Sequence, residues 1–367
     1  MEAKKRNPAA DIIRCLAFFF VVSVHFLLNN GFYDHTVDGE KMFIMTQFRA
    51  LFIICVPLFL TLSGYLLKNK MPSRKYYSRI VGILITYLLA SLFCMGYSAL
   101  FLNETYSLLD VVTEVLGFSG APYAWYVEMY LGLFLLIPFL NVLYKNLPSK
   151  KWKTVLIISL IIVTSLPDVV NVYNFDSLSW WLQPSSSGVR YPLLPDYWRE
   201  FYPITYYFLG CYLNEYGLKI KKSLNLILII LWVPLVGLYS YWRSYGGKFV
   251  SGPWGTYCSL FNLITTVLVF TLIVNFNYEK FPSGFAKVFK FLSPLCLGAY
   301  LVSWVFDSVF YPILAQKVPL MPDRLPYYFI IVPLVFLCSL TVSFLLSKIQ
   351  FLLEFAFAKC KALIVKK

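Results

Sequence analysis

Charged residues are scarce in this sequence. Of its 367 residues, 14% are Asp, Glu, Lys or Arg, whereas 59% are hydrophobic and 19% are aromatic. An ordinary soluble domain has about a quarter of its residues charged, and a water-soluble fold of this length cannot bury so much apolar surface. The composition therefore excludes an ordinary soluble protein and predicts an all-α, polytopic membrane protein in contact with a lipid bilayer.

Acidic residues are the rarer of the two charged kinds. The chain has 18 Asp and Glu against 32 Lys and Arg, which gives a net charge of +14. Such an excess in a soluble protein suggests nucleic-acid binding, but in a membrane protein Lys and Arg accumulate in the cytoplasmic loops. We therefore expect the charge to mark the orientation of the chain in the membrane, and we expect no nucleic-acid partner.

Metal-binding and disulfide patterns are missing. The eight cysteines are scattered without a C-x-x-C pair, and the chain has only two histidines, His25 and His35. We therefore predict neither a disulfide framework nor a metal site. The first apolar run, residues 12–28, is followed by no small-residue cleavage site, so we expect a membrane span there and not a cleaved signal peptide.

Ten apolar segments are long enough to cross a bilayer, which takes about 20 residues. Lys and Arg concentrate in alternate connecting loops, and this predicts that both termini are cytoplasmic. The fifth and sixth segments are the weakest, and an eight-span protein with that pair re-entrant is the alternative. We expect one membrane domain, residues 1–355, and a short basic cytoplasmic tail, residues 356–367. The predicted spans are residues 12–29, 43–66, 80–102, 124–144, 154–173, 201–216, 224–242, 257–276, 291–311 and 328–354.

Two ionisable residues lie on one face of the first predicted span. Arg14 and His25 are eleven positions apart, which is about three helical turns and about 16 Å along the axis. An Arg near the cytoplasmic end, with Asp11 one turn earlier, suits a phosphate group, and a deep histidine suits proton transfer. From the residues alone, an interfacial Arg and a helix-bridging His explain the pattern about as well.

The remaining charges in or beside the spans fall into two tiers. Arg49, Glu128 and Asp307 are placed by their spans near the depth of His25, and Arg79 is placed near that of Arg14, backed by Arg74 and Lys75. Charged residues inside spans are costly and are candidates for function. The alternative for Arg49 and Glu128 is a structural ion pair. The two tiers suggest a phosphate-bearing donor that enters from the cytoplasm and chemistry near the outer face.

Three motifs resemble the acyltransferase-3 family of membrane proteins, which includes O-acyltransferases of bacterial surface polysaccharides. The first is Asp11-Ile-Ile-Arg14 followed by ten residues and His25. The second is the apolar run at residues 56–67 that contains Ser-Gly-Tyr, and the third is the Ala-Trp-Tyr that opens residues 124–138. Two positions depart from the family pattern. Arg79 lacks the second Arg of an Arg-x-x-Arg pair, and Ser303 stands where many relatives have a histidine.

The resemblance implies transfer of an acyl group, acetyl being the commonest in the family, from cytoplasmic acyl-coenzyme A to a hydroxyl of an extracytoplasmic surface glycan. The location it implies is the bacterial plasma membrane. His25 would act as the general base or form an acyl-histidine. From their estimated depth in the membrane alone, we expect Glu128 to orient the imidazole or bind the acceptor and Arg49 to stabilise the oxyanion. The candidate residues are His25 and Glu128 for catalysis, Arg14, Arg79, Arg74 and Lys75 for the donor, and Arg49, Trp125 and Asp307 for the substrate or oxyanion.

Two other classes of function remain alternatives at this point. The same ionisable residues could line the path of a transporter or flippase of glycans or lipid-linked intermediates. We find no inverted repeat and no matching pair of broken spans, which are the usual marks of such a protein. A non-catalytic assembly partner with vestigial catalytic residues is the second alternative. The sequence does not indicate an oligomeric state.

Overall fold

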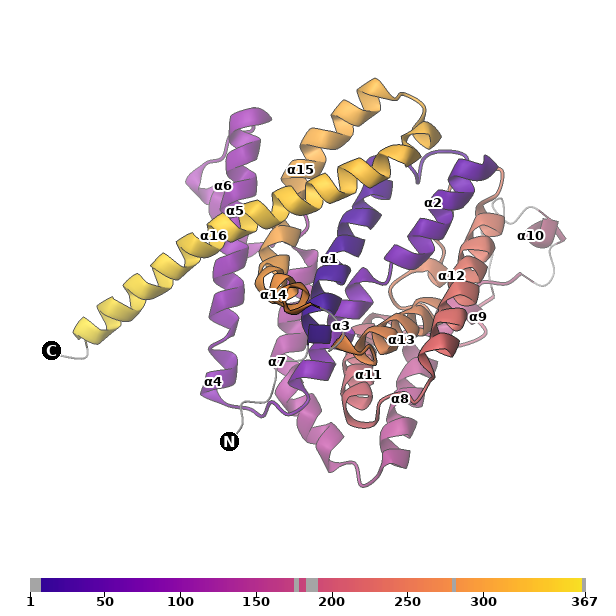
Figure 1. Cartoon of the computed structure of the whole chain (residues 1–367), viewed down its shortest axis with the longest axis horizontal. Coiled ribbons are helices and arrows are strands. Elements are labelled where there is room, and N and C mark those ends of the chain that lie inside the picture. The colour runs from indigo at the N-terminus through magenta and orange to yellow at the C-terminus, as the bar shows by residue number, and fades with distance from the viewer. Residues whose placement is uncertain (1–7, 175–177, 183–190, 279–281, 365–367) are drawn as a thin grey trace.

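The structure is a bundle of helices (Figure 1). The computed structural model describes residues 8–174, 178–182, 191–278 and 282–364, and within these ranges the only β-pairing is two isolated bridges, Thr36–Lys248 and Val37–Tyr245. The α-helices are α1 (Pro8–Asn29), α2 (Gly39–Phe52), α3 (Cys55–Leu67), α4 (Arg74–Tyr77), α5 (Ile80–Phe101), α6 (Leu108–Leu116), α7 (Trp125–Asn146), α8 (Lys150–Thr164), α9 (Pro167–Val170), α10 (Leu178–Leu182), α11 (Tyr202–Tyr216), α12 (Lys222–Ser244), α13 (Leu260–Val274), α14 (Ser283–Leu292), α15 (Cys296–Lys317) and α16 (Tyr328–Ile364). Short 3-10 turns are η2 (Arg199–Phe201), η3 (Pro253–Gly255), η5 (Ser293–Leu295) and η6 (Met321–Tyr327).

The predicted all-α membrane fold is confirmed. In the described part of the chain, eight helical stretches are long and apolar enough to cross a membrane, and each overlaps one of the ten predicted spans. The fifth and sixth predicted spans correspond to α8 and α11, which have 15 residues each and are about 22 Å long. This is shorter than a hydrocarbon core of about 30 Å. The choice between eight and ten crossings, and the cytoplasmic placement of the termini, stay predictions.

The C-terminal boundary of the predicted domain falls inside a helix. α16 runs without interruption to Ile364, so the predicted basic tail at residues 356–367 begins within α16, and its last three residues lie outside the described part of the chain. Figure 1 shows α16 extending to the far left of the view, beyond the other helices. The division into a domain and a tail stays a prediction.

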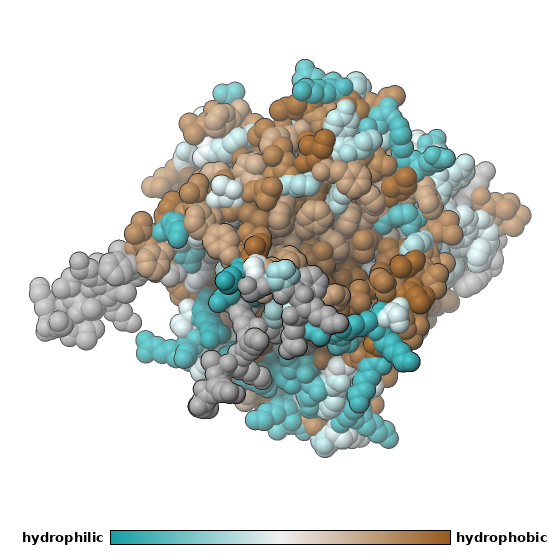
Figure 2. Space-filling view, viewed as in Figure 1, coloured by the Kyte–Doolittle hydropathy of each residue, from teal (hydrophilic) through white to brown (hydrophobic). Residues whose placement is uncertain are grey.

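The surface of the molecule is largely apolar, as lipid contact requires. Figure 2 shows a broad hydrophobic face with hydrophilic residues gathered mainly at its lower edge and at the top and right. Large apolar side chains are exposed along α5, α12 and α16, where water-soluble proteins place polar groups. Examples are Leu88 and Leu92 on α5, Ile230, Leu231 and Leu235 on α12, and Phe329, Ile330 and Leu337 on α16.

Helix α1 lies at the centre of the bundle. It packs against α2, α3, α13, α14, α15 and α16, and most of its residues between Ala9 and Leu27 are buried. A helix enclosed on all sides must be apolar all round, and α1 is, apart from a few polar positions. Arg14 and His25 are therefore held inside the bundle by the most constrained helix of the fold.

The span that follows α1 is broken in its middle. α2 ends at Phe52 and α3 begins at Cys55, because Pro57 has no N–H with which to bond the carbonyl of Ile53. The break lets the two halves take different neighbours: α2 packs on α12, and α3 packs on α11. Arg49 on α2 is thereby separated from the Ser-Gly-Tyr segment on α3.

Two glycines allow α3 and α11 to cross in close contact. A Cβ added at Gly64 would lie 1.8 Å from the carbonyl oxygen of Tyr207, and one added at Gly210 would lie 2.0 Å from that of Thr61. Side chains larger than hydrogen would push the helices apart, so both positions need glycine. The glycine of the Ser-Gly-Tyr motif of α3 is thus explained by the packing of α3 on α11.

We predict that Gly64→Ala destabilises the protein. The added methyl group overlaps the backbone of α11, and overpacking of this kind costs about 1–3 kcal/mol. Thermal unfolding of the purified protein in detergent, followed by tryptophan fluorescence, would show a lower midpoint. Gly132→Ala on α7 is the matched control, because nothing lies within 4 Å of a Cβ there and alanine favours the helix by up to about 1 kcal/mol. Equal midpoints for the two variants would contradict the packing argument.

Candidate functional site

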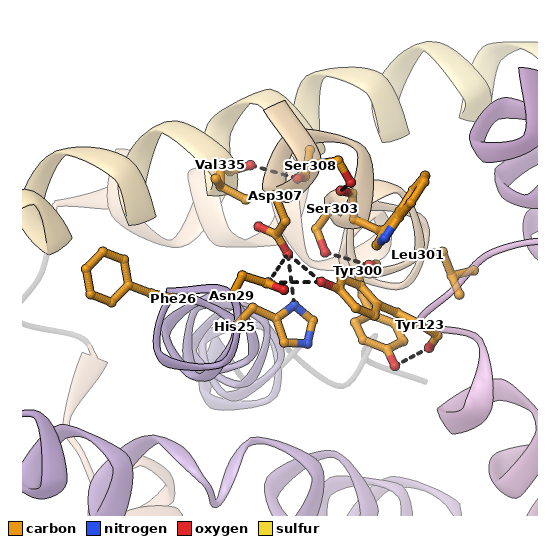
Figure 3. A network of polar contacts seen from close by, with 12 residues as sticks. His25, Phe26, Asn29, Tyr123, Tyr300, Leu301, Ser303, Asp307, Ser308 and Val335 are labelled. Atoms are coloured by element: carbon orange, nitrogen blue, oxygen red, sulfur yellow. Dashed lines mark hydrogen bonds and ion pairs between the residues drawn. The ribbon is translucent and has the colours of Figure 1, made fainter. Parts of the chain in front are cut away.

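A histidine and an aspartate meet between α1 and α15. Nδ1 of His25 lies 3.3 Å from Oδ2 of Asp307, and the two side chains are 11% and 2% exposed. Figure 3 shows Asn29 and Tyr123 converging on the same carboxylate. The hydroxyl of Tyr123 donates to Oδ2 of Asp307 at 2.8 Å, and the amide of Asn29 lies 3.3 Å from that oxygen. One carboxylate oxygen therefore gathers groups from α1, from α15 and from the segment before α7.

The surroundings of the imidazole fix its orientation. Its ring lies 4.0 Å from the ring of Tyr123, centroid to centroid, and the Tyr300 hydroxyl in turn donates to the backbone carbonyl of Tyr123. A carboxylate beside Nδ1 favours the tautomer with the proton on Nδ1, which leaves Nε2 as a free base. The second ring nitrogen of His25 points away from Asp307 (Figure 3). The arrangement can accept a proton on that side.

A cavity of about 270 Å³ lies along α1 on one side of this pair. It is lined mainly by apolar residues of α1, α3, α5, α7 and α15, and we call it the Arg14 cavity. Along α1 it reaches from Arg14 to Val21, a distance of about 10 Å, and Val21 is one turn before His25. Tyr126, Tyr130 and Tyr300 supply hydroxyl groups to its wall. The cavity can hold a slender, mostly apolar group that ends near the imidazole.

Arg14 is held in place at the far end of this cavity. It forms an ion pair with Asp11 at 3.7 Å and donates to the hydroxyl of Ser293 in η5, and its side chain is 30% exposed. Arg79 stands just before α5, one turn ahead of the cavity residue Ile83. Arg79, Arg74 and Lys75 are all exposed. The structure therefore places one guanidinium in the cavity wall and three further cations in the chain segment that leads into α5.

A second cavity, of about 320 Å³, lies further along α1, and we call it the Arg49 cavity. Its wall includes Val24 and Leu28, which flank His25 in the sequence, and residues of the segment 251–257. Arg49 is buried, with Nε 3.0 Å from the Tyr33 hydroxyl and Nη2 3.3 Å from the carbonyl oxygen of Gly255. On α1, His25 thus lies one turn beyond the Arg14 cavity and within the stretch that lines the Arg49 cavity, and each cavity contains an arginine.

The structure separates Glu128 from the pair. Its side chain is exposed on the first turn of α7, and the position beside the imidazole, for which Glu128 was a candidate, is held by Asp307. The alternative Arg49–Glu128 ion pair is also replaced, because Arg49 bonds to Tyr33 and Gly255. Trp125 is 40% exposed and stacks on Tyr257, a residue of the Arg49 cavity, at 5.7 Å.

Several residues of the site were not predicted from the sequence. Asn29 is four positions after His25 and so shares its helix face, which is a signal that was present. Tyr123 directly precedes the Ala-Trp-Tyr motif, and nothing in its local pattern indicates that it contacts a histidine. Among the described residues, no group of three or more His, Cys, Asp or Glu side chains is placed to hold a metal ion. The absence of a metal stays a prediction.

Fold and site together define a multi-pass membrane protein with a histidine–carboxylate pair buried among its helices. The family model described as "Acyltransferase domain" (Acyl_transf_3) matches residues 7–348, which is nearly the whole chain. The chain therefore belongs to the acyltransferase-3 family, as its three motifs predicted, and it is a membrane acyltransferase. No curated protein and no solved structure matches it.

We predict that Asp307→Asn lowers kcat for acyl transfer by about 100-fold, the lower end of the contribution of positioned proton transfer. The amide keeps the shape of the carboxylate but removes the negative charge that favours a proton on Nδ1 of His25. Steady-state kinetics on the purified protein would measure it. Asp323→Asn is the control, because Asp323 is an exposed carboxylate paired with Lys41. An unchanged kcat in Asp307→Asn would rule out the orienting role.

Proposed function

We propose that the protein transfers an acyl group, acetyl by analogy with the family, from cytoplasmic acyl-coenzyme A to a hydroxyl group of a surface glycan outside the cytoplasm. The location would be a bacterial plasma membrane. The observation that carries this proposal is the position of the His25–Asp307 pair, with His25 one turn beyond the Arg14 cavity and within the stretch of α1 that lines the Arg49 cavity. Such an arrangement suits two substrates that approach one base from opposite sides.

The Arg14 cavity suits the donor. Its apolar wall and its length of about 10 Å along α1 match an acyl chain on a pantetheine arm, and Arg14 at its end can bind a phosphate through two parallel hydrogen bonds. Arg79, Arg74 and Lys75 would add positive charge where the nucleotide part of the donor lies outside the cavity. In this placement the thioester lies near Val21, one turn from His25.

The chemistry at His25 follows from its free Nε2. Nε2 takes the proton of the acceptor hydroxyl while that oxygen attacks the thioester carbonyl, so a C–O bond forms. The C–S bond then breaks, and the imidazolium returns the proton to the departing coenzyme A thiolate. Asp307 stabilises the positive imidazolium between the two steps. An acyl-histidine intermediate on the same nitrogen is the alternative order of events.

The Arg49 cavity suits the acceptor. Trp125, stacked on Tyr257 at its edge, offers an aromatic surface, and Glu128, three residues later on α7, offers a carboxylate that can accept hydrogen bonds from sugar hydroxyls. Arg49 lies in the wall of this cavity, and we assign it to binding of the acceptor or to stabilisation of the oxyanion. Mass spectrometry of surface glycans from cells with and without the gene would identify the acceptor and the acyl group.

We predict that His25→Ala abolishes acyl transfer, with a fall in rate of about 10²–10⁴-fold, because the base is removed. The measurement is transfer of label from radioactive acetyl-coenzyme A in membranes that contain equal amounts of each variant. His35→Ala is the matched control, since it replaces the only other histidine of the chain. Full activity in His25→Ala would overturn the proposal. Arrested glycan export with normal acylation of the product would instead indicate a transporter.

We predict that substitution of Arg14 and substitution of Arg49 affect the kinetics of different substrates. Arg14→Gln should raise the KM for acyl-coenzyme A about tenfold or more, the effect of losing a charge-assisted hydrogen bond, with the KM for the acceptor unchanged. Arg49→Gln should raise the KM for the acceptor or lower kcat, with the KM for the donor unchanged. Each variant is the control for the other. The reverse pattern would show that donor and acceptor have been placed on the wrong sides.

A further inference from the structure

A third cavity lies apart from the His25–Asp307 pair, where α3, α7, α8 and α11 meet the turn after α3. Its volume is about 570 Å³, which lies within the range of about 300–1,000 Å³ usual for ligand sites. We call it the lysine pocket, because it is lined by Lys68, Lys145 and Lys153 together with Asn69, Met71, Tyr144 and Glu215. None of these residues is used in the acyl-transfer chemistry described above.

One glutamate orders two of the three lysines. Glu215 lies 2.8 Å from Nζ of Lys153 and 3.8 Å from Nζ of Lys68. Lys153 is 9% exposed and also lies over the ring of Tyr144, with Nζ 4.7 Å from the ring centroid. Three ammonium groups against one carboxylate leave the pocket positive, and Lys145 is exposed at its edge. The charges of Lys68 and Lys153 are thus held in place by Glu215, and Lys145 adds a third, exposed charge.

The first turn of α8 increases this positive potential. A helix N-terminus carries a partial positive charge and normally attracts acidic side chains. α8 has no acidic residue in its first turn, and its N-cap Ser149 makes no side-chain capping bond. Lys150 and Lys151 occupy that turn, and Lys153 follows in the pocket wall. Cations at this end of a helix repel its dipole, and a bound anion would relieve the repulsion.

The lysine pocket adjoins the Arg14 cavity through the last turn of α3. Leu66 and Leu67 line the Arg14 cavity, and the next residue, Lys68, lines the lysine pocket. The turn is held rigidly, since the amide of Asn141 donates to the carbonyl oxygens of Leu67 and Lys70 at 2.8 and 2.7 Å. A donor that extends out of the Arg14 cavity past Leu67 therefore meets fixed positive charge.

We propose that the lysine pocket binds the phosphorylated nucleotide end of the acyl donor, with Lys68 and Lys145 as ligands of its 3′-phosphate. This inference rests on the proposed function, in which the donor is an acyl-coenzyme A. It adds a specificity determinant for that donor, because a donor without the 3′-phosphate would lack the contacts with Lys68 and Lys145. Arg14 would then hold the diphosphate nearer to the apolar cavity.

The test is binding of adenosine 3′,5′-bisphosphate to the purified full-length protein, measured by isothermal titration calorimetry. Lys68→Gln and Lys145→Gln should each raise the Kd about fivefold, as expected for one partly exposed ion pair. Binding of 5′-AMP, which lacks the 3′-phosphate, should be weak in every variant. Lys219→Gln is the control, because Lys219 is an exposed lysine in the α11–α12 connection outside the pocket. Thermal midpoints would verify that each variant is folded.

The outcomes separate this inference from the proposed function. An unchanged Kd in both lysine variants, with acyl transfer from acetyl-coenzyme A intact in the unmodified protein, overturns the lysine pocket alone. Absence of both transfer and nucleotide binding in the unmodified protein overturns the donor itself. If the variants change only the retention of anionic phospholipid in nanodiscs, the pocket is a lipid site and the nucleotide assignment is overturned.

Discussion

The buried carboxylate of Asp307 is the constraint on which the site depends. A carboxylate among membrane helices is costly unless it is paired and hydrogen-bonded. Its partners are His25 and Asn29 on α1 and Tyr123 before α7, so satisfying one charge fixes two parts of the chain against α15. Because the same contacts hold Nδ1 of the imidazole, the electrostatic requirement of the fold also determines where Nε2 points.

The Arg14 cavity and the Arg49 cavity are separate because α2 and α3 diverge beside α1. Pro57 breaks the second span, so that α2 follows α12 while α3 follows α11. Gly64 and Gly210 then bring α3 and α11 together at backbone contact distance. Arg49 and Val56, only seven residues apart, consequently belong to different cavities. The break between α2 and α3, together with the close contact of α3 with α11, therefore places Arg49 in one cavity and the α3 wall of the Arg14 cavity in another part of the bundle.

The sequence predicted those features that depend on one helix at a time. The common face of Arg14 and His25 follows from helical periodicity, and the spans follow from apolar length. The choice of Asp307 over Glu128 as the partner of His25 did not follow, because depth along a span can be estimated from sequence whereas the direction of a side chain around its helix depends on packing. The shortness of α8 and α11, in contrast, has local causes, since Pro167 follows the end of α8 and Gly217 caps the end of α11. Tyr123 was missed because it lies outside any span.

The buried acids differ in the kind of partner that each one has. Among the described residues three carboxylates are almost fully buried, Asp11, Asp168 and Asp307, with 2%, 1% and 3% exposure. Asp11 is paired with Arg14, and Asp168 with Arg199. A guanidinium stays protonated in proteins, so these two pairs cannot exchange a proton with a substrate. Asp307 instead faces the imidazole of His25, and a neutral imidazole has one donor and one acceptor nitrogen. Of these three buried pairs, this one alone joins two groups that can each exchange a proton, and it is the pair to which the proposed function assigns the chemistry.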